Sequence, residues 1–284
     1  MQKIIEGVLH PTDFSEGSRV AFFHALKAAL LSKSRLTLLN VSSDANPRWN
    51  DFPGVRETLE MWNMLPKGSP RSAVIDLGID VRKAIMPKND PVEGVIDYMT
   101  KFPADMIVLA TQQKRGMSRW LSSSVAEPIA RRALEMTLFI PGETDGFVSA
   151  SDGSVSLKNI LIPVAAAPRP QPALEAAARI VTSMGVTEGT FTLMHVGDSN
   201  SMPGVSTPDV EGWNWETETR SGDVIQSIID VSNETNADLI VMSTDGRNGF
   251  LDGLRGSHSE RVLRQTGVPL LTVPLGSLLY DITA

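Results

Sequence analysis

The residues best suited to bind an anion lie between Ala237 and Val262, where an apolar run leads into a glycine-rich loop and a helix start. The run up to Ser243 is rich in branched side chains, which is typical of a strand buried in a parallel sheet. Ser257 stands at an N-cap position, with Glu260 at the spacing of a capping box. The loop glycines permit positive φ angles and close approach of the backbone to a ligand; they are Gly246, Gly249, Gly253 and Gly256.

A helix N-terminus offers unpaired N–H groups and about half a positive charge, so this stretch is interpreted as a phosphate site. In that interpretation His258, in the first turn, contributes its backbone N–H. The alternative is a flexible loop, because glycine-rich turns between strand and helix are common in α/β proteins.

Little in the sequence indicates catalysis. The four histidines have neither the spacing of metal ligands nor a triad partner, so packing or solvent exposure is expected for His10, His24 and His195. Asp13 follows the first expected strand, where its charge would favour the dipole of the next helix. We therefore expect no enzyme and no metal site.

Composition limits the class of protein. The 284 residues are enough for two domains, and no apolar run approaches the ~20 residues of a membrane span. The first residues run directly into a strand pattern, so no signal peptide is expected. Without cysteine the chain suits a reducing cytoplasm, and a net charge of −7 argues against nucleic-acid binding.

The chain contains an internal repeat. ADMIVLAT at 104–111 matches ADLIVMST at 237–244, and LTLLNV at 36–41 matches FTLMHV at 191–196. The two shifts, 133 and 155 residues, place an insert of 22 extra residues in the first copy. We therefore predict domain 1 over 1–141, a linker over 142–156 and domain 2 over 157–284.

Each copy alternates strands and helices, which predicts an α/β fold: two repeated, doubly wound domains, each with a five-stranded, mainly parallel sheet covered by helices on both faces. The insert, 42–77, carries one expected helix over 55–65 and several Trp and Met side chains. They either cover the strand ends or pack a surface helix onto the sheet. The linker is small, polar and without a period, and it leaves the domains free to dock either way.

Both halves resemble universal stress protein domains. The resemblance rests on Pro-Thr-Asp-Phe-Ser after the first strand, the Ala-Asp-aliphatic-Ile-Val fourth strand, and the loop pattern Gly-x2-Gly-x9-Gly-Ser. It implies that the loop binds the phosphates of ATP, with Mg²⁺ only as part of that complex, and that an aspartate contacts the adenosine end. Val41 and Val196, at the ends of the second strands, are assigned to the same nucleotide site.

Each half departs from this pattern at a different place. The second keeps Ser243, Gly246, Gly256 and Ser257 but has Ala165 where the aspartate is expected. The first keeps Asp13 but places Gln113 and Ser123 where the loop requires glycine. We therefore expect ATP binding to be weak or absent and confined to the second half.

Two functions are consistent with these residues: a stress-response regulator that senses an adenine nucleotide, or a nucleotide-free scaffold for an unknown protein partner. A slow ATPase would be a third, although no base is visible. The resemblance also implies that the last strands, TLFIP and PLLTVP, pair with each other. We expect this pairing to form a pseudo-dimer within one chain, with a homodimer as a further level of assembly.

Overall fold

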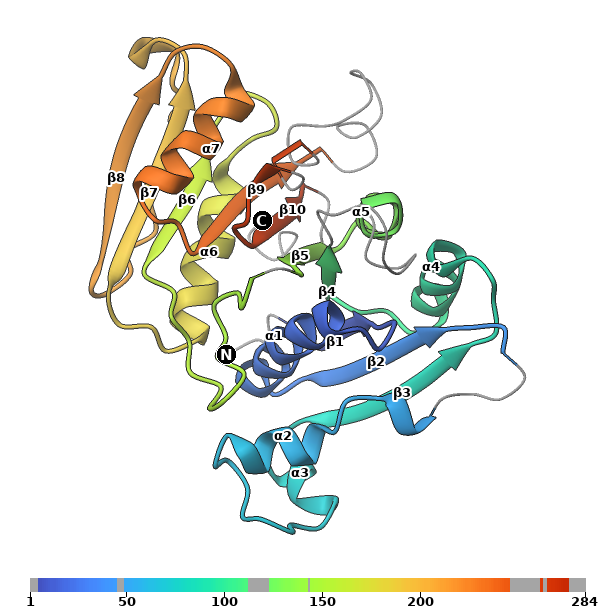
Figure 1. Cartoon of the computed structure of the whole chain (residues 1–284). Coiled ribbons are helices and arrows are strands. Elements are labelled where there is room, and N and C mark those ends of the chain that lie inside the picture. Colours follow the sequence, from blue (N-terminus) through green and yellow to red (C-terminus); the bar gives the residue numbers. More distant parts are fainter. Residues whose placement is uncertain are drawn as a thin grey trace.

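A computed structural model describes residues 5–44, 49–111, 123–142, 144–245, 261–262 and 265–275. It contains one ten-stranded sheet in the order β3-β2-β1-β4-β5-β10-β9-β6-β7-β8 (Figure 1). Each half contributes five parallel strands, as the alternating pattern predicted. The strands are β1 Gly7–Pro11, β2 Arg35–Val41, β3 Asp80–Met86, β4 Met106–Thr111, β5 Met136–Pro141, β6 Asn159–Pro163, β7 Gly189–Val196, β8 Trp213–Arg220, β9 Leu239–Thr244 and β10 Leu270–Pro274.

The halves meet where β5 and β10 pair in antiparallel register, with Leu138 opposite Leu271. This confirms the predicted pairing of the two apolar last strands. Both edges would otherwise expose unpaired backbone groups, and their pairing removes that exposure from both halves at once. The Thr272 hydroxyl adds a bond of 3.3 Å to the Thr137 carbonyl across the junction.

Helices cover both faces of the sheet. They are α1 Glu16–Ser32, α2 Val55–Met61, α3 Ser72–Asp76, α4 Pro91–Lys101, α5 Ser123–Ala133, α6 Gln171–Ser183 and α7 Val224–Glu234. Phe22 of α1 and Leu174 of α6 share one core, whereas Val95 of α4 and Ile228 of α7 share the core on the other face. Each core runs through both halves, so the sheet junction lies inside continuous apolar packing. Among the described residues, no helix is long and apolar enough to cross a bilayer.

The insert packs its aromatic residues on the first half, as the surface-helix alternative predicted. Phe52 and Trp62 are buried in the core on the α1 side, and Trp49 is half-exposed. The expected helix ends at Met61, earlier than predicted, since Asn63 takes a φ of 57° and breaks the helical path. The short helix α3 was not predicted. Figure 1 shows α2 and α3 together beside β3.

The segment 142–156, which we call the connector, has more structure than its composition indicated. Phe147 and Val148 are buried, and Val148 forms a β-bridge with Val155. The small, polar composition that predicted an open linker instead forms tight turns, with Gly146 at φ 64° and Gly153 at φ 69°.

The repeated Ala-Asp before β4 and β9 has a structural role. The Oδ2 atom of Asp105 accepts hydrogen bonds from the N–H groups of Glu6 and Gly7 at 2.6 and 2.9 Å. Asp238 does the same for Lys158 and Asn159 at 2.8 and 2.9 Å. Each carboxylate therefore fixes the backbone at the start of the first strand of its half.

We expect Asp105→Ala and Asp238→Ala to lower the free energy of unfolding by similar amounts, about 1–2 kcal/mol each, because each leaves two backbone donors without their charged acceptor. Urea unfolding measures both. Asp230→Ala, on the exposed face of α7, is the control and should cost less than about 0.5 kcal/mol. Equal effects of all three variants would contradict this role.

Candidate functional site

A small cavity lies at the carboxyl ends of β6, β7 and β9, where ligands bind in open α/β sheets. Its volume is about 170 Å³. Val196 and Ser243 of the predicted site line it, together with Ala165. Sequence reasoning missed the rest of the lining, since no motif marks it: Pro163, Val164, Ala167, Pro168, Pro170, Met194, Val224, Ile228 and Met242.

Of the described residues that line the cavity, all but Ser243 are apolar, and the Ser243 hydroxyl is already engaged. The Ser243 hydroxyl accepts the N–H of Ala173 at 3.2 Å and donates to the Pro170 carbonyl at 3.5 Å. It therefore stabilises the first turn of α6. The cavity thus suits the flat apolar faces of a heterocycle better than a charged group.

The chain after β6 is held by a side chain of β7. His195 Nδ1 lies 3.0 Å from the Val164 carbonyl, and in the first half Asn40 Nδ2 donates to the Thr12 carbonyl at 2.8 Å. Asn40 of the first half and His195 of the second occupy equivalent positions. This shared contact with the carbonyl after the first strand explains why one repeat has Asn and the other has His. Packing of His195 is confirmed, because the ring is buried and its Nε2 lies 3.0 Å from Ser201 Oγ.

Asp13 lies in the turn between β1 and α1. Its Oδ1 accepts the N–H of Ser15 at 3.0 Å, and Ser15 in turn accepts the N–H of Ser18 as the N-cap of α1. Phe14, between them, has a φ of 65°. This arrangement fits the prediction that the carboxylate favours the helix start.

Val41 and Val196 occupy equivalent positions but have different surroundings. Val41 is buried under α4, so closely that a Cβ on Gly94 would lie 2.4 Å from its Cγ1. Val196 is only partly buried and faces the cavity under α7. In the first half, the close packing of α4 fills the space next to Val41.

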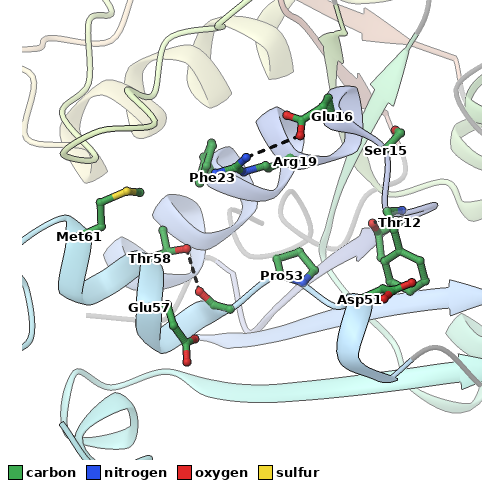
Figure 2. Close-up of a pocket in the computed structure, with 12 residues that line it drawn as sticks. Thr12, Ser15, Glu16, Arg19, Phe23, Asp51, Pro53, Glu57, Thr58 and Met61 are labelled. Carbon is green, nitrogen blue, oxygen red and sulfur yellow. Dashed lines mark hydrogen bonds and ion pairs between the residues drawn. The ribbon is translucent and has the colours of Figure 1, made fainter. Parts of the chain in front are cut away.

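A larger cavity of about 400 Å³ separates the start of α1 from α2 (Figure 2). Phe14, Phe23 and Met61 contribute apolar surface to it, and Asp13 does not line it. The charged residues among its described lining are Glu16, Asp51, Glu57 and Arg19, of which Arg19 pairs with Glu16 at 3.7 Å. These carboxylates repel phosphate, and the predicted anion site lies in the other half of the chain.

Four predicted site residues lie outside the described part of the chain: Gly246, Gly256, Ser257 and His258. Gln113 of the first loop also lies outside it, and Ser123 is described only as the first residue of α5. The described lining of the cavity reaches Ser243, two residues before Asp245, and the predicted phosphate loop follows in the sequence. The described residues contain no group of His, Asp and Glu side chains that could hold a metal ion.

His10 and His24 are fully buried and line neither of these two cavities. His10 Nδ1 lies 2.9 Å from the Val108 carbonyl, and His24 Nδ1 lies 2.9 Å from the Val20 carbonyl. Burial lowers the pKa of each imidazole to about 4. Both rings are therefore neutral at pH 7, and packing is confirmed for both.

Comparison with known proteins supports one family. The model of the universal stress protein family matches residues 5–141 and 210–274. A universal stress protein from Archaeoglobus fulgidus DSM 4304 is 20% identical, with a TM-score of 0.61, over 97% of this chain and 100% of that one. A protein of unknown function from Pseudomonas aeruginosa PAO1 is 13% identical, with a TM-score of 0.56, over 95% and 92%.

The cytoplasmic domain of a prokaryotic cation chloride cotransporter is similar in fold, with 14% identity and a TM-score of 0.50 over 94% of each chain. No curated protein matches the sequence. These structures share the fold over nearly the whole chain, and the family match covers most of it in two segments. The chain belongs to the universal stress protein family.

Proposed function

We propose that this protein is a regulatory protein of the stress response that senses an adenine nucleotide weakly through its second half, without catalysing a reaction. The observation that carries the proposal is the cavity of about 170 Å³ lined by Ala165, Val196 and Ser243. It is smaller than the ~300 Å³ at which small-molecule pockets begin, so it has room for a base but not for a whole nucleotide. The phosphates would extend past Ser243 to the backbone of the following loop.

Two features weaken this site for ATP. The missing carboxylate at Ala165 removes a charged hydrogen bond worth about 1.5–3 kcal/mol. Asp245, which is exposed at the start of the loop, repels phosphate by about 3 kcal/mol at ~6 Å and an effective dielectric near 20, before screening. Because each ~1.4 kcal/mol is tenfold, a micromolar site would weaken to the millimolar range. Mg²⁺ would enter only with the triphosphate.

The second candidate function is a nucleotide-free scaffold for a protein partner. It is favoured by the contacts of two predicted site residues, since the Ser243 hydroxyl holds α6 and Asp13 holds the start of α1. In either case we propose that the protein works in the cytoplasm, with which a chain without cysteine is compatible.

Titration calorimetry with Mg-ATP separates the two functions. We expect weak binding to the wild type, about tenfold or more tighter binding to Ala165→Asp, and none to Gly256→Val, which places a branched side chain in the phosphate loop. Asp13→Ala is the matched control in the first half and should bind like the wild type. Tight binding that survives Gly256→Val would place the site elsewhere.

A simpler measurement tests the scaffold directly. Protein purified without added nucleotide is denatured, and the supernatant is examined for an adenine absorbance. Release of such a compound would contradict the scaffold. Its absence decides nothing by itself, since a millimolar site also loses its nucleotide during purification, and the scaffold is then tested by Ala165→Asp, which should not bind Mg-ATP.

A further inference from the structure

The connector is held to the first half by two side chains that lie far from it in the sequence. His24 Nε2 accepts the N–H groups of Phe147 at 3.0 Å and Val148 at 3.2 Å. Trp62 of the insert donates its indole N–H to the Ala150 carbonyl at 3.1 Å. The connector is thus fixed at two points, one on α1 and one on the insert.

The fit at both points is close. A Cβ on Gly146 would lie 2.4 Å from His24 Nε2, and a Cβ on Gly153 would lie 2.5 Å from Trp62 Cδ2. The ring centroids of His24 and Phe147 lie 4.6 Å apart, in an edge-to-face arrangement. Glycine is therefore required at both positions by positive φ and by contact with these rings.

The hydrogen bonds of His24 need a neutral ring. Nδ1 donates its proton to the Val20 carbonyl at 2.9 Å, which leaves Nε2 as a bare acceptor for two donors. A second proton on Nε2 would point at both N–H groups, so both bonds would be lost and a cation would be buried. Protonation and connector docking are therefore mutually exclusive.

Among the described residues His24 forms no ion pair with a carboxylate, and the pKa of its ring is shifted by burial and by the Val20 carbonyl. Lys27 lies on α1, and the described part of the connector carries Asp145 and Asp152. Asp152 acts on Lys27, whose pKa is lowered by burial and raised by that carboxylate. The strands packed against α1 bring no carboxylate, and β4 and β5 bring no titratable side chain at all. The titratable side chains on the other two strands are His10 of β1 and Arg35 of β2.

We propose that His24 is an acid-sensitive latch: a proton on Nε2 releases the connector from α1 while the pairing of β5 with β10 keeps the halves together. Release separates Phe147 and Val148 from His24 and exposes apolar surface that is buried at neutral pH. The connector and Phe23 also line a cavity of about 410 Å³, which this movement would open. The device is independent of nucleotide binding in the second half.

Hydrogen exchange of the full chain between pH 7 and pH 4 tests the latch, with protection factors corrected for the intrinsic pH dependence of exchange. We expect the Phe147 and Val148 amides to lose protection about tenfold per pH unit once the released imidazole binds a proton. The amides of β10 should keep theirs over the same range. Constant protection at Phe147 and Val148, or loss of protection in the connector and in β10 together, would overturn the proposal.

Three variants assign the effect to His24. His24→Gln offers an acceptor that does not titrate, so its connector should exchange at a rate independent of pH after correction. Gly146→Ala forces a Cβ against His24 and should open the connector already at pH 7 without changing any titratable group. His10→Gln removes a buried histidine that does not contact the connector, and it should exchange like the wild type. Retained pH dependence in His24→Gln would show that another group controls the connector.

Discussion

Replacing Leu271 by aspartate is expected to separate the two halves of the sheet. Leu271 is fully buried, lies opposite Leu138 at the β5–β10 junction, and belongs to a core that runs through both halves. A carboxylate there loses the packing of a leucine, worth about 2–5 kcal/mol, and is buried without a partner. We expect a loss of at least about 4 kcal/mol and two separate unfolding transitions in place of one.

The double variant Leu138→Asp/Leu271→Asp should have a still lower free energy of unfolding, since two carboxylates then face each other across the junction. Hydrogen exchange at the backbone of β5 and β10 reports separation directly. Thr217→Asp, on the exposed edge strand β8, is the control and should leave this exchange unchanged. Junction amides that stay protected in the double variant would contradict a sheet held together by this pair.

The sequence predicted the strands and their order along the chain because fully buried parallel strands have a strong local pattern and occur twice. Trp213 and Trp215 illustrate this. Residues two apart share one face of a strand, and both rings pack on Phe191, with centroids 4.5 and 4.2 Å from its ring. The N-cap of α4 has an equally local cause: Asp90 precedes a proline, and its side chain accepts the N–H of Val92 at 2.8 Å.

The connector could not be predicted in this way. The conformation of the connector depends on His24 and Trp62. Along the sequence, these residues are 123 and 88 positions from their respective backbone partners. Small and polar residues form a flexible linker or a tight turn according to such distant partners, and nothing local distinguishes the two. For the same reason the sequence identified Ser243 as a site residue but did not show that its hydroxyl is committed to α6.

Acid is expected to destabilise the whole protein through its two buried histidines. The folded imidazoles of His10 and His24 have pKa values near 4, whereas the unfolded value is 6.5. Between these values the unfolded chain binds protons that the folded chain does not, so stability is full above pH 6.5 and falls as the pH drops toward 4. The loss is about 3 kcal/mol per histidine, which is large against the 5–15 kcal/mol of a typical domain.

One carboxyl group acts in the opposite direction. Burial, with a smaller contribution from Asp105, raises the pKa of Glu135 to about 7, so proton uptake there favours the folded state as the pH falls. Glu135 is only half-buried, and solvent screens its effect. Two fully buried imidazoles therefore determine the sign of the pH dependence, although its slope is smaller than their sum.

Urea unfolding at several pH values between 6.5 and 4.5 measures this slope. His10→Gln and His24→Gln should each remove one proton from the number taken up on unfolding, about 1.4 kcal/mol per pH unit, whatever they cost at pH 7. His195→Gln is a weaker control, because that ring also holds the Val164 carbonyl. Glu135→Gln is the better control. It removes the group that acts in the opposite direction, so the dependence of the unfolding free energy on pH should become steeper. If both histidine variants kept the wild-type slope, the acid sensitivity would have to come from other groups. If only His24→Gln reduced it, the latch on the connector would account for most of the acid sensitivity of the fold.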